Sequence, residues 1–150
     1  MKYLILMIFA FIFNGCSPNI TYIDVSNEEK YSKIIGKTFK TLKPLRLTAN
    51  LVDDYKSKVI WSYTISETGF AGRYVLWNKK LLRGTLITIN KILKYDSVII
   101  DDFTLRVYIK DIIFNDNLPI DLYSTLTKTT KDGKYIIMNS KYFQEVKLDK

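Results

Sequence analysis

From residue 37 to the end of the chain, apolar and polar residues alternate with a period of two. This period is typical of β-strands that bury one face. The clearest segment is 103–110, where Phe103, Leu105, Val107 and Ile109 occupy every second position. The alternation breaks at 111–114, as it does at a β-bulge or in a strand that changes sheets. Further strands are predicted at 45–51, 61–65, 74–77, 86–89 and 143–148.

The turn-forming residues between these segments fit short strands. Asp132 and Gly133 separate the apolar ends of a predicted hairpin over 125–138, because Asp-Gly is a strong hairpin signal. Pro119 is expected to keep its surroundings off a central strand, since proline has no backbone N–H to donate. The pattern predicts about eight strands in total.

A single stretch before residue 37 has a helical period. Asn27 is placed as an N-cap, and the two glutamates that follow it suit the positive end of a helix. Tyr31, Ile34 and Ile35 form one apolar stripe, and Gly36 is placed to end the helix. The sequence therefore predicts a two-turn helix over 28–35.

Strands without amphipathic helices between them argue against a parallel α/β sheet. We therefore expect a mainly β fold, a small antiparallel barrel or sandwich with one short N-terminal helix. The segment 81–89, in which Gly84 precedes an alternating strand, resembles part of an SH3-like barrel. We see no repeat and no internal linker, so residues 28–150 are predicted to form a single domain.

The first 16 residues have a different character. Lys2 precedes the uncharged apolar run 3–13, which is too short for a membrane span of about 20 residues. Its length matches the hydrophobic region of a secretory signal peptide, about 7–15 residues. A buried helix or strand of a cytosolic domain is the alternative, and the leading lysine and the small residue at its end favour export.

The end of this run, Phe13-Asn14-Gly15-Cys16, resembles the lipobox of bacterial lipoproteins. Gly15 fits the small position, whereas Phe13 and Asn14 differ from the residues most common there. The resemblance implies that residues 1–15 are a signal peptide and that Cys16 is lipidated. It implies a diacylglyceryl group and often an additional acyl chain, and two or more chains give stable anchoring. A soluble secreted protein remains the alternative.

Lipidation also explains why the chain has a single cysteine, because a secreted domain normally pairs its cysteines. Residues 16–27 are predicted to be a lipidated tether whose end can form a strand. Ser17 is not the aspartate that holds such proteins at the inner membrane. The resemblance therefore implies a place in the cell envelope, with the outer membrane favoured in a Gram-negative cell.

The net charge is +8, or +7 without Lys2. This excess indicates either attraction to an acidic partner or a lysine-rich solvated surface. The dispersed positions of the basic residues favour the solvated surface. A location outside the cytoplasm argues against nucleic acid as the partner.

The chain offers little for catalysis. It has no histidine, and its one cysteine is assigned to lipid, which excludes the common nucleophile–base sites. Asp53-Asp54 and Asp101-Asp102 are adjacent pairs whose side chains would point to opposite faces of a strand. Asp111, Asp116 and Asp121 lack the spacing of a calcium loop. We therefore expect no enzymatic activity, no metal and no cofactor.

An aromatic-rich region surrounds a predicted hairpin between the second and third strands. It contains Trp61, Tyr63, Phe70, Tyr74 and Trp77. These side chains could fill the core of a β-domain, which the sequence favours, or form a surface for a sugar or a protein. Trp77 is expected to reach the surface, and the candidate interaction surface consists of Trp77, Lys79, Lys80 and Arg83.

These features predict a lipid-anchored binding or structural module of the cell envelope. Its partners would be the membrane, through the lipid, and an envelope protein or a wall polymer. The alternative is an inhibitor or immunity lipoprotein that blocks a toxin or a wall-degrading enzyme.

Overall fold

A computed structural model of the chain describes residues 22–53, 58–95, 103–109, 118 and 120–147, the side chains of residues 95 and 103–109 excepted. In this part of the chain, nine strands form one sheet and two form a separate hairpin. The strands are β1 (Tyr22–Asp24), β2 (Thr38–Thr41), β3 (Leu45–Leu51), β4 (Ile60–Ser66), β5 (Val75–Leu81), β6 (Leu86–Tyr95), β7 (Phe103–Ile109), β8 (Ile120–Leu122), β9 (Thr127–Thr129), β10 (Ile136–Met138) and β11 (Phe143–Val146).

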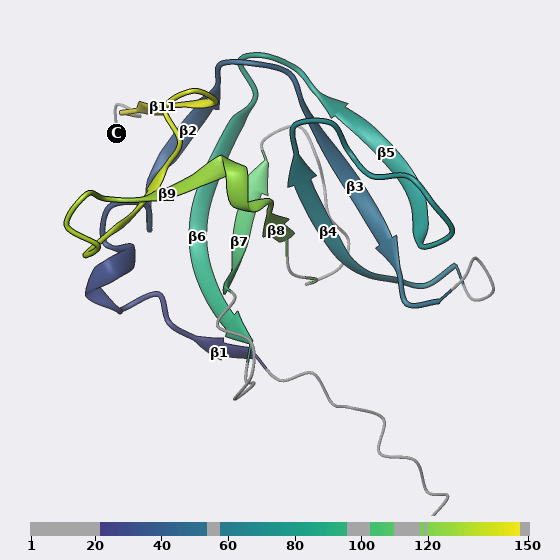
Figure 1. Cartoon of the computed structure of the whole chain (residues 1–150), viewed down its shortest axis with the longest axis horizontal. Helices are drawn as coiled ribbons and strands as arrows, with labels where there is room; N and C mark the ends of the chain where they lie inside the picture. Colours follow the sequence, from purple (N-terminus) through teal and green to yellow (C-terminus); the bar gives the residue numbers. More distant parts are fainter. Residues whose placement is uncertain (1–21, 54–57, 96–102, 110–117, 119, 148–150) are drawn as a thin grey trace, which may run out of the picture.

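The sheet has the strand order β11-β2-β6-β7-β8-β4-β3-β5, and β1 pairs with β6 beside β2. All neighbours are antiparallel except β4 and β8, which are parallel. The mainly β, antiparallel prediction is confirmed, but no closed barrel forms, because β11 and β5 at the two ends do not pair. The sheet curves through the molecule, with β2 and β6 on one side and β3, β4 and β5 on the other (Figure 1).

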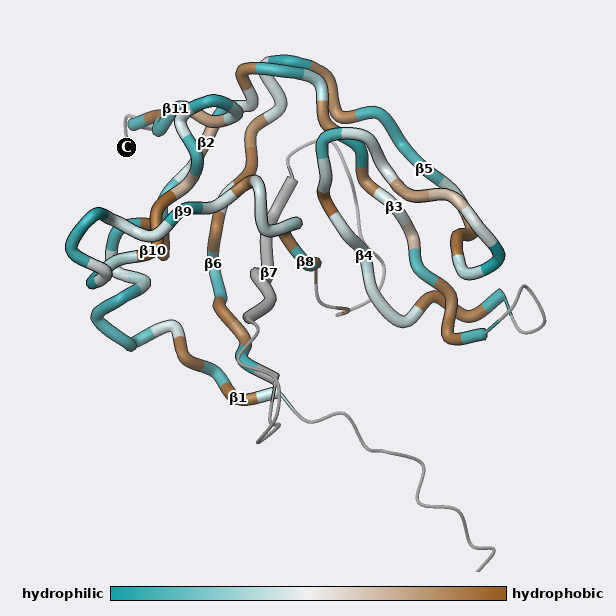
Figure 2. The backbone as a smooth tube through the Cα atoms, viewed as in Figure 1, coloured by the Kyte–Doolittle hydropathy of each residue, from teal (hydrophilic) through white to brown (hydrophobic). Residues whose placement is uncertain are grey.

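The hydrophobic core lies on the inner face of this curve. Along β6, hydrophobic and hydrophilic residues alternate (Figure 2), and Ile87 and Ile89 are fully buried. The turn at Gly84, with φ +91°, precedes this strand as predicted. Leu126 and Met138, from the segment around the β9–β10 hairpin, belong to the same core. The hairpin therefore covers part of the sheet, and it crosses in front of β6 in Figure 1.

The β9–β10 hairpin confirms the prediction made from Asp132 and Gly133. Ile136 pairs with Thr129, and Gly133 has φ +75°, a conformation that glycine adopts without strain. Its strands are shorter than predicted, because residues 124–126 form a turn of 3-10 helix instead.

The two-turn helix predicted over 28–35 is not shown. Residues Glu29–Tyr31 form a single turn of 3-10 helix, followed by turns up to Gly36. The Ile34 and Ile35 N–H groups both donate to the Tyr31 carbonyl, and the next N–H, that of Gly36, donates to the Ile89 carbonyl of β6 at 2.7 Å, so the hydrogen bonding passes from a local turn to the sheet. The predicted apolar stripe is nevertheless used, because Tyr31 and Ile34 are buried in the core.

β8 contradicts the expectation for the surroundings of Pro119. Ile120 pairs with both Tyr63 of β4 and Leu105 of β7, so it lies in the interior of the sheet. A proline removes only its own N–H, and the strand begins at the next residue, whose N–H is intact. The predicted phase break at 111–114 lies outside the described residues.

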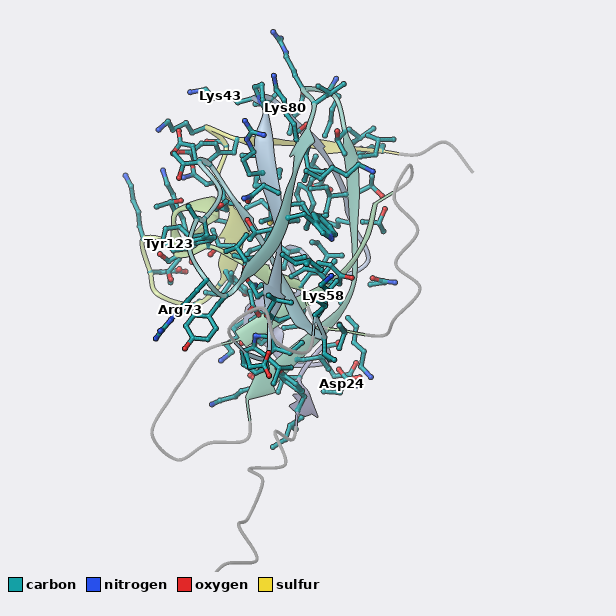
Figure 3. All side chains as sticks on the ribbon, turned by 90° about the vertical axis from the view of Figure 1, so that its right-hand side faces the viewer. Asp24, Lys43, Lys58, Arg73, Lys80 and Tyr123 are labelled. Carbon is teal, nitrogen blue, oxygen red and sulfur yellow. The ribbon has the colours of Figure 1, made fainter. Side chains whose placement is uncertain are left out.

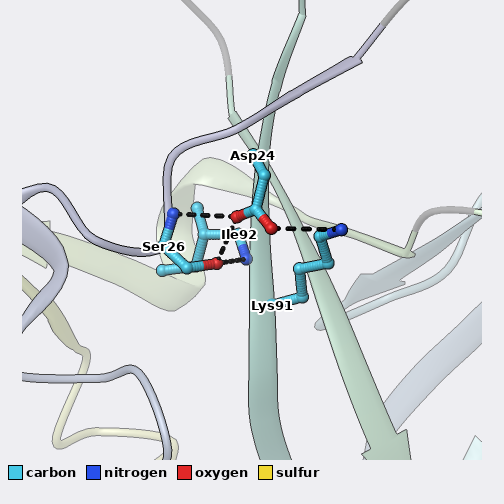
Figure 4. A network of polar contacts seen from close by, with 4 residues as sticks. All are labelled: Asp24, Ser26, Lys91 and Ile92. Atoms are coloured by element: carbon cyan, nitrogen blue, oxygen red, sulfur yellow. Dashed lines mark hydrogen bonds and ion pairs between the residues drawn. The ribbon is translucent and has the colours of Figure 1, made fainter.

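Polar contacts fasten β1, within the predicted tether, to β6 (Figure 4). The Ser26 hydroxyl and backbone N–H both donate to Asp24, and the Ile92 N–H donates to the Ser26 hydroxyl. Lys91 forms an ion pair with Asp24 at 3.1 Å. The Ser26 hydrogen bonds, helped by Lys91, lower the pKa of Asp24 to about 2. The folded part of the chain thus includes residues before 28.

Candidate interaction surface

The candidate surface is built around β3, the strand between β4 and β5. Its alternating sequence gives an apolar inner face, where Leu45, Leu47 and Ala49 are buried, and a polar outer face with Arg46, Thr48 and Asn50. β4 continues both faces, since Ile65 pairs with Leu47 and Thr64 pairs with Thr48. The alternation of apolar and polar residues predicted for this strand therefore determines which face is buried in the core and which is polar.

The polar outer face is a hydrogen-bonded layer. The Asn50 side-chain amide donates to the Ser62 hydroxyl at 3.1 Å and to the Thr64 hydroxyl at 2.9 Å. Thr48, which is fully buried, donates to the Asn78 side-chain carbonyl at 2.6 Å. Asn78 thereby ties β5 to β3 through side chains as well as through the backbone.

The layer also holds the connection between β4 and β5, residues 67–74. Asn78 donates to the Phe70 carbonyl at 2.8 Å, and the Gly69 N–H donates to the Ser66 hydroxyl at 3.0 Å. Gly69 has φ +77°, and a Cβ there would lie 2.8 Å from the Asn78 side-chain oxygen and 3.2 Å from Arg46. Only glycine fits without rearrangement, because both the backbone and the space require it.

This connection is a crossover and not a hairpin. β4 and β5 both run antiparallel to β3 and lie on opposite sides of it, so residues 67–74 pass over the outer face of β3 to reach the far side. The sequence placed the aromatic residues around a hairpin. The structure instead spreads them over a crossover and over the last strand of the sheet.

The expectation that the aromatic residues fill the core is wrong for Trp61, Phe70 and Tyr74, whereas Trp77 reaches the surface as predicted. Tyr63 is buried, but Trp61 is 41% exposed, Tyr74 is 48% exposed, and Phe70 and Trp77 are 37% and 36% exposed. They stay outside because three of them belong to the crossover and the end strand β5, and Trp61 lies where the register of β3 and β4 shifts.

Two groups of exposed aromatics can be distinguished. Trp77 packs on the buried Tyr63, with ring centroids 5.9 Å apart. On the crossover, Phe70 contacts Tyr123 edge-on at 5.5 Å, and the Arg73 guanidinium lies 5.0 Å from the Tyr74 ring. We call Phe70, Tyr74 and Tyr123 the crossover cluster. Sequence analysis missed Tyr123, because it lies 53 positions after Phe70 and nothing in the sequence signals this contact.

The four residues predicted as the candidate surface lie together along the chain in β5 and the turn after it. We call Trp77, Lys79, Lys80 and Arg83 the edge surface, and all four are exposed. Trp77 and Lys79 lie on the inner face, opposite Ala49 and Leu47, whereas Lys80 lies on the outer face, opposite Arg46. The sequence therefore identified an exposed strand, but its charges are divided between two faces.

Like Lys40 and Lys43, the basic residues of the edge surface form no ion pair in the described part of the chain. Among the described residues, Lys37, Lys91 and Lys141 form ion pairs with Glu145, Asp24 and Glu67, whereas no ion pair involves Lys79, Lys80 or Arg83. Figure 3 shows Lys80 near Lys43 at one end of the molecule and Asp24 of β1 at the opposite end. The positive charge of β5 thus lies far from the start of the folded chain.

No group of three or more potential metal ligands occurs within the described ranges. Asp53 follows β3 and is half-buried, and Asp121 lies in β8 beside Thr64. Asp54, Asp101, Asp102, Asp111 and Asp116 lie outside the described residues, as does Cys16. In the same ranges, no helix is long and apolar enough to cross a membrane.

Comparisons of this chain with protein-family models, with curated proteins and with solved structures found no match.

Proposed function

We propose that this protein is a non-catalytic binding module of the cell envelope, anchored by lipid on Cys16. The observation that carries the proposal is the exposure of Trp61, Phe70, Tyr74 and Trp77 in one region of the sheet. Aromatic side chains are enriched in interfaces, because they offer much contact area for little loss of conformational freedom. The partner is an envelope protein or a wall polymer.

The anchor is supported by the lipobox-like sequence and by the position of the first strand. Five residues lie between Cys16 and Tyr22 of β1, and the chain from one to the other spans at most about 20 Å when fully extended. The β1 end of the domain would therefore stay close to the membrane surface. Lys80, at the opposite end from Asp24, would face away from it (Figure 3).

Lipidation is tested by growing cells with an alkyne-bearing fatty acid and fractionating their membranes. We expect the native chain and a Ser17→Ala control to carry the label and to be found in the membrane fraction. Cys16→Ala should lose both the label and the membrane association. A labelled Cys16→Ala chain, or an unlabelled native chain that keeps residues 1–15, would refute the lipid anchor.

Binding is tested in intact cells with a photo-crosslinking amino acid in place of Phe70, and with Lys131 in the β9–β10 turn as the matched control position. We expect one partner to be enriched at Phe70 only. A wall-degrading enzyme or a toxin would identify the inhibitor or immunity form of this function. Equal recovery of abundant proteins at both positions would count against a binding module.

A further inference from the structure

β5 forms one end of the sheet, and the register shows which of its backbone groups point outward. The Leu51 N–H donates to the Tyr74 carbonyl on the β5 side, whereas the Val52 N–H donates to the Val59 carbonyl on the β4 side. Neighbouring residues of a strand direct their N–H groups to opposite sides. Leu47 and Ala49 therefore bond toward β5, through their partners Lys79 and Trp77.

The residues between these partners must point the other way. Asn78 and Lys80 thus direct their N–H and C=O groups away from β3, and no strand lies beyond β5 in the described part of the chain. The four consecutive residues 77–80 are all exposed, so side chains on both faces of the strand reach solvent. β5 presents the unpaired backbone row to which an extended chain can add.

The charges of β5 determine which chain could pair with it. The strand and the turn after it contain three basic residues and no acidic residue, and these three have no ion pair among the described residues. Lysines on an edge strand oppose pairing with neutral or basic strands, including a second copy of the same edge. They favour an acidic strand, because oppositely charged side chains on adjacent strands attract.

We propose that β5 binds an extended acidic segment of another envelope protein, which adds to the sheet as a further strand beside β5. This inference rests on the proposed function and specifies its partner. Trp77 and Lys79 lie on the same face, two residues apart, so the segment would place an apolar residue beside Trp77 and an acidic residue beside Lys79. A second acidic residue on the other face would lie beside Lys80.

Strand addition is tested in intact cells with the full chain, by placing the photo-crosslinking amino acid at Lys79 or, as a control, at Gln144 of β11. Lys80→Pro removes an outward N–H, and Lys80→Ala keeps it. Proline is tolerated on a strand edge where its N–H would face solvent. We expect Lys80→Pro to lower crosslinking at position 79 by about two- to ten-fold relative to Lys80→Ala, as the loss of one hydrogen bond predicts.

Charge is tested with the double variant Lys79→Glu/Lys80→Glu, which keeps every backbone group; its crosslinker replaces Trp77. Crosslinking from Trp77 should fall about tenfold or more relative to the same crosslinker in a chain that is otherwise native. In purified lipidated protein, a fluorescent peptide Thr-Val-Thr-Glu-Glu-Thr-Val-Thr, which in either direction can place Val beside Trp77 and Glu beside Lys79 and Lys80, should bind more tightly than the same peptide with glutamine in place of glutamate. The double variant should abolish this preference. Because the double variant Lys79→Glu/Lys80→Glu keeps every backbone N–H, it tests the proposal even if Lys80→Pro fails to fold.

The proposal is supported if position 79 captures an acidic segment of another protein that position 144 does not. It is overturned by crosslinks to a second copy, to lipid or to glycan. Equal yields for the proline and alanine variants, or for positions 79 and 144, also overturn it. If capture at Phe70 succeeds while position 79 captures nothing, strand addition fails and the binding module stands. If neither captures a partner, the proposed function itself fails.

Discussion

The two ends of the sheet, β5 and β11, differ in almost everything that governs whether a strand edge is open. β5 has seven residues, and four consecutive ones are exposed, whereas β11 has four residues and begins with the buried Phe143. The outward backbone of β11 is also partly used, because the Phe143 N–H donates to the Asn139 carbonyl. Because Tyr142 bonds toward β2, only Phe143 and Glu145 of β11 direct their backbone groups outward, and the N–H of Phe143 is already bonded.

The charges follow the same division. At the β11 end, Glu145 forms an ion pair with Lys37, the residue before β2. At the β5 end, Lys79 and Lys80 have no acidic partner among the described residues. The charge of Glu145 on β11 is thus paired within the domain, whereas the charges of Lys79 and Lys80 on β5 are available to a binding partner. The comparison predicts that substitutions at β11 change stability, whereas those at β5 change binding.

The largest effect is expected at the β11 end. Phe143→Ala removes a buried aromatic side chain and should lower the free energy of unfolding by about 3–5 kcal/mol, because it leaves a cavity. Chemical denaturation of the purified full chain measures this loss. Lys79→Ala at the β5 end is the control and should change stability by less than about 0.5 kcal/mol. Similar losses for both variants would remove the distinction between the two ends.

A second large effect is expected where the crossover leads to β5. Gly69→Ala forces a left-handed conformation on a residue with a Cβ and brings that Cβ to 2.8 Å from Asn78. We expect a loss of about 2–3 kcal/mol by denaturation, with disturbed resonances for Asn78. Gly133→Ala, also at positive φ but with open space around it, separates the cost of conformation from that of the contact. Equal losses at the two glycines would show that the Asn78 contact is unimportant.

Elements that depend on neighbouring residues alone could be predicted from the sequence. The alternation in residues 45–51 and the Asp-Gly turn at 132–133 are local signals, and both elements form as predicted. The helix over 28–35 does not form, and the N–H that follows it, that of Gly36, bonds to Ile89 of β6, a residue more than 50 positions away. A prediction from local propensity cannot include a hydrogen bond to a strand so distant in the sequence.

The candidate site was predicted in part for the same reason. Lys79 and Lys80 were identified as exposed from their charge, but the position of β5 at the end of the sheet depends on strand order. An eight-residue connection between β4 and β5 suggests a hairpin, yet residues 67–74 cross over β3.

An intermediate effect is expected for Trp77→Ala in β5. The side chain is partly exposed and packs on Tyr63, so its loss should lower stability by only about 1–2 kcal/mol. Crosslinking of a partner at position 79 should nevertheless fall, and Trp77→Phe should restore part of it. Denaturation and crosslinking of the same variants separate the two effects. A loss as large as that of Phe143→Ala would place Trp77 with the core and not with the interface.

A smaller effect is expected for the ion pair between Lys37 and Glu145 on β11. The two charged atoms are 3.0 Å apart, but both side chains are partly exposed, so solvent weakens their attraction. A double-mutant cycle with Lys37→Ala and Glu145→Ala should give a coupling of about 0–1 kcal/mol, which decreases at high salt. A coupling energy that does not change with salt would contradict a purely electrostatic interaction between Lys37 and Glu145.

The smallest effect is expected at Asp24, and it concerns only acidic pH. Its pKa is lowered to about 2 in the folded chain, mainly by the Ser26 hydrogen bonds, from an ordinary value of 3.8. A group with a lowered pKa stabilises the fold fully above its unfolded value, and this stabilisation is lost as the pH falls through the folded value. The contacts of β1 should therefore weaken between about pH 4 and pH 2, and Asp24→Asn should remove this dependence. Titration of the Asp24 carboxyl carbon by NMR measures the midpoint, and a midpoint near 3.8 would mean that Ser26 and Lys91 do not hold β1 in solution. β1 is the described strand nearest Cys16 in the sequence. This measurement therefore also shows how strongly the contacts of Asp24 hold the N-terminal strand on β6.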